Sequence, residues 1–258
     1  MRHFPRKRFG QHFLVDESVI AAIVAAIAPR PGDPMVEIGP GLEALTRPLA
    51  RAVDHLHVIE IDRDIVARLR DTLPRERVTV HEGDALEFDF GRLGPGLRVV
   101  GNLPYNISTP LLFHLQSYAS SIRDIHVMLQ KEVVERMAAG PSTSHYGRLS
   151  VMLQYRFEIE RVLDVGAAAF RPPPKVESAV VRMTPHARLP HAARDEGSLA
   201  KIVAAAFAQR RKTLRNTLKG YFTSAELERL GVDAGLRAQD LGVGDFVRLA
   251  DALAQSAA

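Results

Sequence analysis

The sequence predicts an α/β protein whose mixed sheet has about seven strands and is followed by a small helical domain. Short, β-branched and largely apolar segments alternate with helical patterns over the first half of the chain, which is typical of a parallel sheet covered on both faces. Two more strand segments follow with only a loop between them, as in a return at a sheet edge. A change of composition at 184–197 precedes purely helical patterns. We therefore predict domains at 1–185 and 186–258.

The elements follow from local signals in chain order. Asp16 is placed to cap a helix that runs to Ala28, where the proline- and glycine-rich stretch 29–34 stops it. The predicted strands are 35–38, 55–61, 77–81, 98–100, 125–129, 157–163 and 178–183. In the second domain, apolar residues at helical spacing predict helices over 198–222, 224–230 and 242–254.

Composition excludes several classes of protein. The 258 residues are 46 % hydrophobic and 25 % charged, near the globular average, and include no cysteine. Disulfides, thiolate zinc sites, iron–sulfur clusters and cysteine nucleophiles are thereby excluded. The apolar run 19–28 is too short to cross a bilayer, and Asp16 and Glu17 precede it, which is wrong for a signal peptide. We expect a cytoplasmic protein, and no paired-histidine pattern indicates a metal site.

Three successive strand ends carry polar residues that suit an adenosine-type cofactor. The first strand ends in EIGPG at 37–41, where glycines let the backbone approach a ligand at the carboxyl edge of the sheet. Glu60 ends the second strand and can accept from both hydroxyls of a ribose, and Asp84 follows the third and can accept from an adenine amine. The alternative is a ligand-free turn with two surface acids, but three polar strand ends on one rim favour the cofactor.

The fourth strand runs into GNLPYN at 101–106, which resembles the catalytic loop of S-adenosylmethionine-dependent methyltransferases that modify an exocyclic amine. The lone pair of such an amine is delocalised into the base, so acceptors must hold it in a pyramidal form. The Asn102 side-chain oxygen and the Leu103 carbonyl are the expected acceptors, Pro104 shapes the turn, and Tyr105 stacks on the base. Oriented acceptors stabilise the positive charge that develops on nitrogen, so no strong base is needed. An ordinary Asn-Pro turn is the alternative.

Eight segments, in this order and spacing, carry a resemblance over essentially the whole chain. They are RKRFGQHFL (6–14), EIGPGLEALT (37–46), VIEIDRD (58–64), EGDAL (82–86), VVGNLPYNISTPLL (99–112), QKEVVERM (130–137), YGRLSVMLQ (146–154) and FRPPPKVESAVV (170–181). On these the chain resembles the ribosomal small-subunit (16S) rRNA adenine N6,N6-dimethyltransferases. The resemblance implies a Rossmann-like class I methyltransferase domain that transfers methyl groups from S-adenosylmethionine to N6 of two adjacent adenosines, two methyls each. The target is a hairpin loop near the 3′ end of the small-subunit rRNA, in an assembling 30S particle, and nothing suggests an obligate dimer.

The resemblance also implies roles for individual residues. His12 and Leu14 would close over the cofactor, and Gly39 would pass its backbone under the methionine part. Glu60 would bind the ribose and Asp84 the cofactor adenine.

The reacting base has its own implied contacts. Asn102 would lie between the cofactor and the target amine, and Tyr105 with Phe170 would sandwich a flipped adenine, since a stacked base cannot reach a buried methyl donor. Three prolines at 172–174 would stiffen the loop after Phe170.

Two positions depart from the commoner family pattern. His12 stands where many relatives have asparagine, and Glu43 replaces a smaller residue. If Glu43 points inward it would attract the cofactor sulfonium; if outward, it is a favourable acid in a first helical turn.

Positive charge gathers in two stretches of a chain whose net charge is +4. Residues 2–8 and 201–222 contain basic residues and no acid. The segment 209–219 is expected to form a basic helix that contacts the rRNA backbone, with a solvated helix face as the alternative. Arg148, Arg171 and Lys175 are further phosphate contacts or solvated charges.

Two other functions remain open on the sequence. One is the related methyltransferase that modifies a large-subunit rRNA adenine and confers macrolide resistance, although 146–154, 170–181 and the C-terminal domain favour the small-subunit enzyme. The other is a binding protein that acts as an assembly checkpoint or transcription factor on RNA without catalysis, against which the intact Asn102–Tyr105 loop argues.

Overall fold

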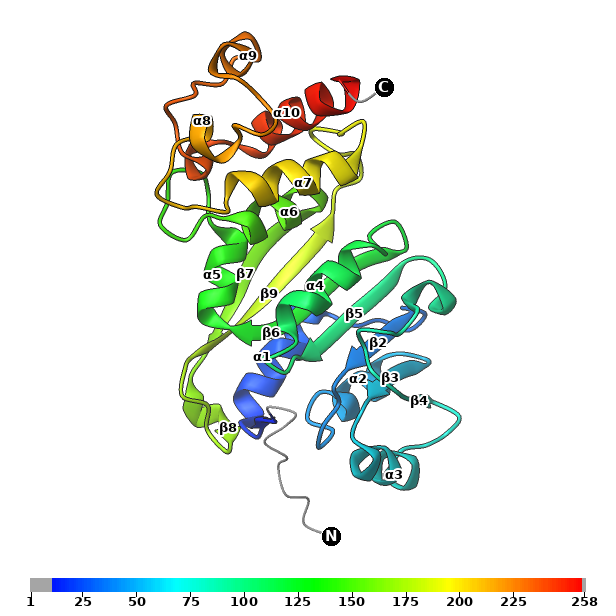
Figure 1. Ribbon diagram of the computed structural model, residues 1–258. Coiled ribbons are helices and arrows are strands. Elements are labelled where there is room, and N and C mark those ends of the chain that lie inside the picture. Colours follow the sequence, from blue (N-terminus) through cyan, green and yellow to red (C-terminus); the bar gives the residue numbers. More distant parts are fainter. Residues whose placement is uncertain (1–10, 257–258) are drawn as a thin grey trace. The chain divides into compact units, whose positions relative to one another are not determined.

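A computed structural model describes residues 11–256, which separate into two compact units (Figure 1). Of the described residues, the first unit contains 11–134 and Ile159–Pro185, and the second contains Glu135–Glu158 and 186–256. The predicted first domain ran without interruption to 185, so the placement of 135–158 differs. Tyr146, Val151 and Tyr155 account for the difference, because their buried side chains join the hydrophobic cluster of the C-terminal helices.

The first unit is built on a seven-stranded mixed sheet in the order β4-β3-β2-β5-β6-β9-β7. The pairs β3–β4, β2–β3, β2–β5 and β5–β6 are parallel, and β6–β9 is antiparallel. All seven predicted strands are present. Their bounds are β2 (Met35–Ile38), β3 (Leu56–Glu60), β4 (Val78–Glu82), β5 (Leu97–Asn102), β6 (Ile122–Gln130), β7 (Phe157–Val165) and β9 (Ser178–Pro185).

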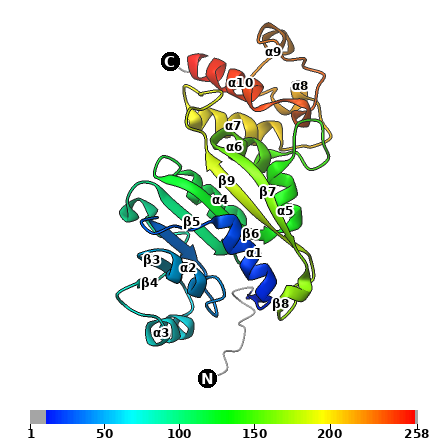
Figure 2. The same cartoon turned by 180° about the vertical axis from the view of Figure 1, so that it is seen from behind.

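Helices cover both faces of the sheet, as the alternating pattern predicts. One hydrophobic cluster joins α1 (Glu17–Ile27), α2 (Thr46–Ala52) and α3 (Arg63–Thr72) to one face, while α4 (Ser108–Gln116) lies on the other (Figures 1 and 2). The remaining elements of this region are η2 (Phe90–Leu93) and α5 (Lys131–Ala138). Asp16 caps α1 as predicted, since its Oδ1 accepts from the backbone nitrogens of Ser18 at 2.9 Å and Val19 at 3.2 Å.

A two-stranded sheet that no pattern predicted brings the start of the described chain to the loop before β9. β1 (Phe13–Leu14) pairs antiparallel with β8 (Phe170–Arg171), and Leu14 lies opposite Phe170. The 3-10 turn η3 (Ala167–Ala169) precedes β8, and the Val15 nitrogen donates to the Ala169 carbonyl at 2.8 Å. Strands of two residues are too short for alternation to be recognised.

The second unit is helical and has its own core. Its helices are α6 (Arg148–Arg156), α7 (Glu196–Ala206), α8 (Leu214–Thr217), α9 (Ser224–Arg229), η4 (Ala238–Asp240) and α10 (Val243–Ser256). None of the helices within residues 11–256 is long and apolar enough to cross a membrane.

The predicted helix 198–222 is wrong in its second half. α7 ends at Ala206, exposed turns follow, and only the four residues of α8 are helical within the basic segment 209–219. The segment 208–213 offers no large apolar side chain to bury, whereas Leu214, Leu218 and Phe222 anchor the chain in the core again. The basic segment is therefore an exposed turn and a short helix rather than one basic helix.

Candidate active site

A cavity in the first unit lies where β2, β3, β4 and β5 end. Its lining includes 11–14, 37–42, 59–61, 83–85 and 102–107. These segments contain every residue predicted to bind the cofactor: His12, Leu14, Gly39, Glu60, Asp84 and Asn102. Leu103, Pro104 and Tyr105 line the same cavity. The fold thus brings together nine of the ten residues predicted from the sequence.

Glycines bring backbone to the cavity and pack the turns closely. Gly39 and Gly41 have φ of +68° and +52°, which L side chains rarely adopt, and the Gly39 nitrogen donates to the Ile59 carbonyl at 3.0 Å. A Cβ at Gly101 would lie 2.4 Å from the Ile38 carbonyl oxygen. Glycine is therefore required at 101 for β5 to approach β2 just before the Asn102–Tyr105 loop.

Two predicted cofactor acids lie at neighbouring strand ends. Glu60 is 7 % exposed, and its Oε1 accepts from the backbone nitrogens of Ile61 and Asp62, both at 2.9 Å. Burial raises the pKa of Glu60, and these backbone donors oppose the shift. Asp84 is half-buried, and its Oδ1 accepts from the Leu86 nitrogen at 2.9 Å. Both carboxyls are thus oriented by backbone donors at the cavity wall.

Glu37 is a cavity residue that the sequence reasoning did not single out. It is 2 % exposed, and its Oε2 has no hydrogen-bond partner among the described residues. Burial raises the pKa of Glu37 to about 8, with the charges of Glu60 and Glu43 adding to the effect and Thr46 opposing it. An unpartnered buried carboxyl is costly, which marks Glu37 as a functional candidate. The available signal was its position as the first residue of EIGPG.

The loop after β5 presents its acceptors in a defined arrangement. Asn102 Nδ2 donates to the His12 carbonyl at 3.0 Å, which leaves Oδ1 as the acceptor of this amide. The Leu103 nitrogen donates to the Met128 carbonyl at 3.1 Å. The Tyr105 hydroxyl shares a 2.7 Å hydrogen bond with Ser178 Oγ, and burial raises the pKa of Tyr105, so the phenol stays neutral.

Comparison with known proteins supplies the family. The model of the ribosomal RNA adenine dimethylase family matches residues 2–255. The chain belongs to the ribosomal RNA adenine dimethylase family. As a member, it is an rRNA methyltransferase that uses S-adenosylmethionine.

Its relatives and structural matches agree with this membership. The "Ribosomal RNA small subunit methyltransferase A" of Thiobacillus denitrificans is 62 % identical over 95 % of this chain and 96 % of its own. The protein of the same name from Chromobacterium violaceum is 61 % identical over 98 % of this chain and 97 % of its own. Among solved structures, a dimethyladenosine transferase from Plasmodium falciparum superposes with a TM-score of 0.78 at 26 % identity, covering 92 % of this chain and 96 % of that one. The structure of the 23S rRNA methyltransferase ErmE superposes with a TM-score of 0.74 at 27 % identity, covering 94 % of this chain and 100 % of that one.

Phe170 is the predicted site residue that the structure does not bring to the cavity. Its side chain is 0 % exposed and belongs to the hydrophobic cluster under α1–α3. The β1–β8 pairing sets it opposite Leu14, so its ring packs in the core. The predicted role of Phe170 as a wall of the base site is therefore not supported; Phe170 instead supports the strand that carries Leu14.

Glu43 follows neither of the two predicted alternatives. It is 1 % exposed, does not line the cavity, and has φ of +72°. Its Oε1 accepts from Arg68 Nε at 3.1 Å and from Thr72 Oγ1 at 2.9 Å, while Oε2 pairs with Arg47. Since α2 begins only at Thr46, Glu43 is not in a first helical turn either. It joins the glycine turn to α2 and α3 through ion pairs between its buried carboxyl and two partly exposed arginines.

The remaining sequence predictions concern charge. The basic stretch 2–8 lies outside the described residues, as does the first part of the segment 6–14. In the second unit, Arg210, Arg211, Lys212, Arg215 and Lys219 are exposed. No group of three or more potential metal ligands occurs within residues 11–256.

Proposed function

We propose that this enzyme dimethylates N6 of two adjacent adenosines in the loop of a hairpin near the 3′ end of small-subunit rRNA, on the assembling 30S particle. The single observation that carries the proposal is the cavity in which the Asn102–Tyr105 loop meets the polar ends of three strands. The printed names of relatives about 60 % identical over nearly the full length support the small-subunit substrate. We also propose a cytoplasmic location and a monomeric enzyme.

The cavity has the donors and acceptors that S-adenosylmethionine requires. The cationic groups of S-adenosylmethionine fit Glu37, because the buried Oε2 of Glu37, which has no hydrogen-bond partner among the described residues, would gain a partner of opposite charge. Glu60 would accept from the ribose hydroxyls, and Asp84 from the adenine amine. Ile61, an apolar cavity residue that is 45 % exposed, would cover the adenine face. His12, Leu14 and Gly39 would contact the methionine part.

The chain's own residues position and polarise the target amine. When bound, S-adenosylmethionine supplies an electrophilic methyl group. Asn102 Oδ1 and the Leu103 carbonyl would accept the two N6 hydrogens and direct the nitrogen lone pair toward that methyl group. Both acceptors favour the positive charge that develops on nitrogen, so a strong base is unnecessary. Tyr105 would stack on the adenine, with its neutral hydroxyl held by Ser178.

The basic residues of the second unit would neutralise rRNA phosphates. Arg210, Arg211 and Lys212 are exposed and adjacent, so they can contact a backbone without burying an unpaired charge. Such contacts add affinity independently of base sequence.

The test is transfer of labelled methyl from S-adenosylmethionine to small subunits that lack this modification, with modified nucleotides identified by mass. Dimethyladenosine at two adjacent positions of the hairpin loop is the expected result. Transfer to large-subunit RNA alone would instead support the activity named for the ErmE structure. Tight particle binding with no transfer to either RNA would support a binding factor.

A further inference from the structure

His12 contacts three parts of the site at once. Its ring nitrogen Nδ1 lies 2.8 Å from the Pro172 carbonyl oxygen, and its ring stacks on Tyr105 with centroids 5.7 Å apart and planes inclined by 27°. Its backbone carbonyl accepts from Asn102 Nδ2 at 3.0 Å. The proline loop, the reaction loop and the segment before β1 therefore meet at one residue.

We propose that His12 is a positioning residue for the target base, beyond the cofactor contact that the family resemblance implies. It orients the Asn102 amide and the Tyr105 ring relative to the proline loop. This inference rests on the proposed function, because it concerns how that reaction places its adenine.

The side chain of His12 is fixed in both tautomer and plane. A carbonyl oxygen can only accept, so Nδ1 carries the proton that bonds to Pro172. That bond sets the plane of the imidazole, and the imidazole in turn covers one face of Tyr105. The Tyr105 hydroxyl is held at the other end of its ring by Ser178, which is fully buried. Tyr105 is thus constrained at its face and at its tip, which leaves the opposite face for a base.

The backbone of His12 controls the Asn102 amide. If the Pro172 bond is lost, the His12 backbone is held less firmly, so its carbonyl fixes the Asn102 amide less well in the orientation that keeps Nδ2 away from the target. An amide turned by 180° would present N–H donors to an amine that needs an acceptor. Misplacement of this kind lowers the rate of transfer while leaving the cofactor's own contacts at Glu60 and Asp84 in place.

The two transfers differ in how strongly they depend on this arrangement. In each, the N6 lone pair forms a bond to the methyl carbon, the carbon–sulfur bond breaks with its electron pair passing to sulfur, and the nitrogen then releases one proton to water. The unmodified amine has two N–H donors for the two acceptors, whereas the monomethylated amine has only one. The second transfer therefore relies more on stacking against Tyr105, so loss of the His12 contacts that hold Tyr105 slows this transfer more than the first.

Three substitutions separate the hydrogen bond from the ring. His12→Asn retains a donor near Nδ1 and removes the ring, His12→Phe retains the ring and removes the donor, and His12→Ala removes both. The measurements are kcat and KM for RNA at saturating S-adenosylmethionine, the cofactor Kd by calorimetry, and the ratio of monomethyladenosine to dimethyladenosine. His55→Ala is the matched control, because His55 is a half-buried histidine of the same unit that does not line the cavity.

We expect His12→Ala to lower kcat at saturating cofactor by about 10–100-fold, with a loss of cofactor affinity too small to account for the loss of rate. His12→Asn, which keeps the donor and introduces the residue of many relatives, is expected to retain more of the rate than His12→Phe, and His12→Ala is expected to accumulate more monomethyladenosine than the wild type. Unchanged kcat and product ratio in His12→Ala would overturn the inference, as would a loss of cofactor affinity that accounts for the whole loss of rate. A wild-type chain that transfers no methyl group would count against the proposed function instead. Thermal unfolding of each variant identifies any that fails to fold.

Discussion

Buried carboxyl groups at the two ends of the parallel strands have pKa values shifted in opposite directions. At the cavity end, Glu37 and Glu60 are buried and their pKa values are raised, chiefly by loss of solvent. At the other end, Asp33 and Asp124 are also withdrawn from water, yet partners of opposite charge and hydrogen bonds lower their pKa values. Within residues 11–256, neither carboxyl at the cavity end has a cationic partner and one oxygen of Glu37 has no hydrogen bond, whereas at the other end both carboxyls are paired with arginine.

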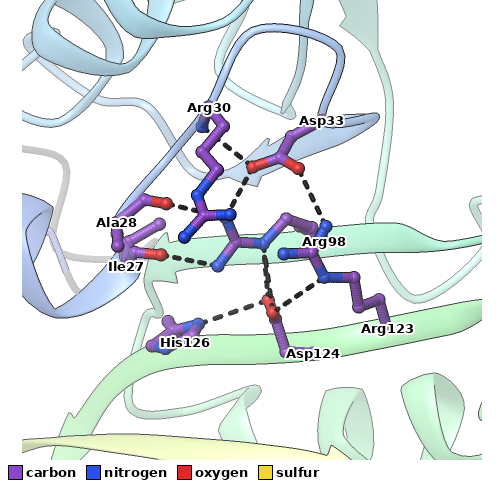
Figure 3. Close-up of polar contacts among 8 residues, drawn as sticks. All are labelled: Ile27, Ala28, Arg30, Asp33, Arg98, Arg123, Asp124 and His126. Atoms are coloured by element: carbon purple, nitrogen blue, oxygen red, sulfur yellow. Dashed lines mark hydrogen bonds and ion pairs between the residues drawn. The ribbon is translucent and has the colours of Figure 1, made fainter.

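Arg98 is the centre of the satisfied end (Figure 3). It is 3 % exposed, its Nη1 donates to Asp33 Oδ2 at 2.7 Å, and its Nε lies 3.0 Å from both oxygens of Asp124. Its Nη2 donates to the carbonyl of Ile27 at 2.5 Å, at the C-terminal end of α1 where a cation is favourable. Arg123 Nη1 supplies a second cation to Asp33 at 2.8 Å.

The difference separates residues that stabilise the fold from residues that await a ligand. The buried ion pairs of Arg98, with their hydrogen bonds, join α1, β5 and β6. A buried carboxyl without a partner lowers stability until a cation or donor arrives, so its cost is offset only when the ligand binds. Both ends are polar and buried, and only their pairing distinguishes their roles.

The largest effect expected on stability is at the paired end. Arg98→Met should lower the free energy of unfolding by about 3–5 kcal/mol, because Asp33 and Asp124 remain buried without their main partner. Denaturant unfolding measures the change. The fraction that remains folded should keep wild-type kcat, because Arg98 does not line the cavity. A drop in kcat at equal folded concentration would show that the two ends are coupled.

The largest effect expected on activity is at Asn102. Asn102→Ala removes one of the two proposed acceptors and should lower kcat by about 10²–10³-fold, similar to loss of one oriented group that stabilises transition-state charge. Labelled methyl transfer under saturating conditions measures it. RNA binding and the unfolding midpoint should stay near wild type, and a variant that keeps more than a tenth of the activity would contradict the acceptor role.

Affinity for the cofactor tests whether Glu37 meets a cation. In the free protein its carboxyl is protonated below a pKa of about 8, whereas a bound cation favours the ionised form. Binding therefore releases a proton, and affinity should rise from pH 6 to pH 8. Glu37→Gln should weaken binding about tenfold at pH 8, or 1.4 kcal/mol, and remove this slope. Calorimetry in two buffers of different ionisation enthalpy measures the released proton. If cofactor affinity depends on pH equally in the wild type and in Glu37→Gln, Glu37 does not pair with the cofactor cation.

Much of the fold followed from the sequence, because its strands and the α1 cap carry local signals. The β1–β8 pair did not, since two-residue strands show no period. The helix expected over 198–222 failed because a basic run with no buried side chain cannot be distinguished from a solvated helix face without knowing where the core ends. In the candidate site, strand-end positions were enough to gather Glu60, Asp84 and Asn102, whereas His12 was assigned only from the family resemblance.

Side-chain pairing was the part that the sequence did not reveal. Glu43 pairs with Arg68, Phe170 turns into the core, and Arg98 bonds to Asp33, and each contact joins residues far apart in the chain. The contrast between Asp33 and Glu37, which lie only four positions apart, depends on such contacts. Both are acids near β2, and only their three-dimensional neighbours make one stabilising and the other destabilising.

A matched pair of amide substitutions tests that contrast through the sign of each change in stability, with an effect of about 1–2 kcal/mol expected at Asp33. Asp33 has a folded pKa below its unfolded value of about 3.8, so it stabilises the fold above that pH and loses this contribution as the pH falls through the folded pKa. Asp33→Asn should therefore be less stable than wild type at pH 7, with a difference that shrinks in acid. Glu37 has a folded pKa of about 8, above its unfolded value of 4.5, so its favourable contribution is complete below pH 4.5 and is lost as the pH rises toward 8. Glu37→Gln should be more stable than wild type at pH 8, with a difference that shrinks toward pH 5. Urea unfolding across this pH range measures the free energy of unfolding of both variants. If the two substitutions change it in the same direction at pH 8, then pairing does not make Asp33 stabilising and Glu37 destabilising.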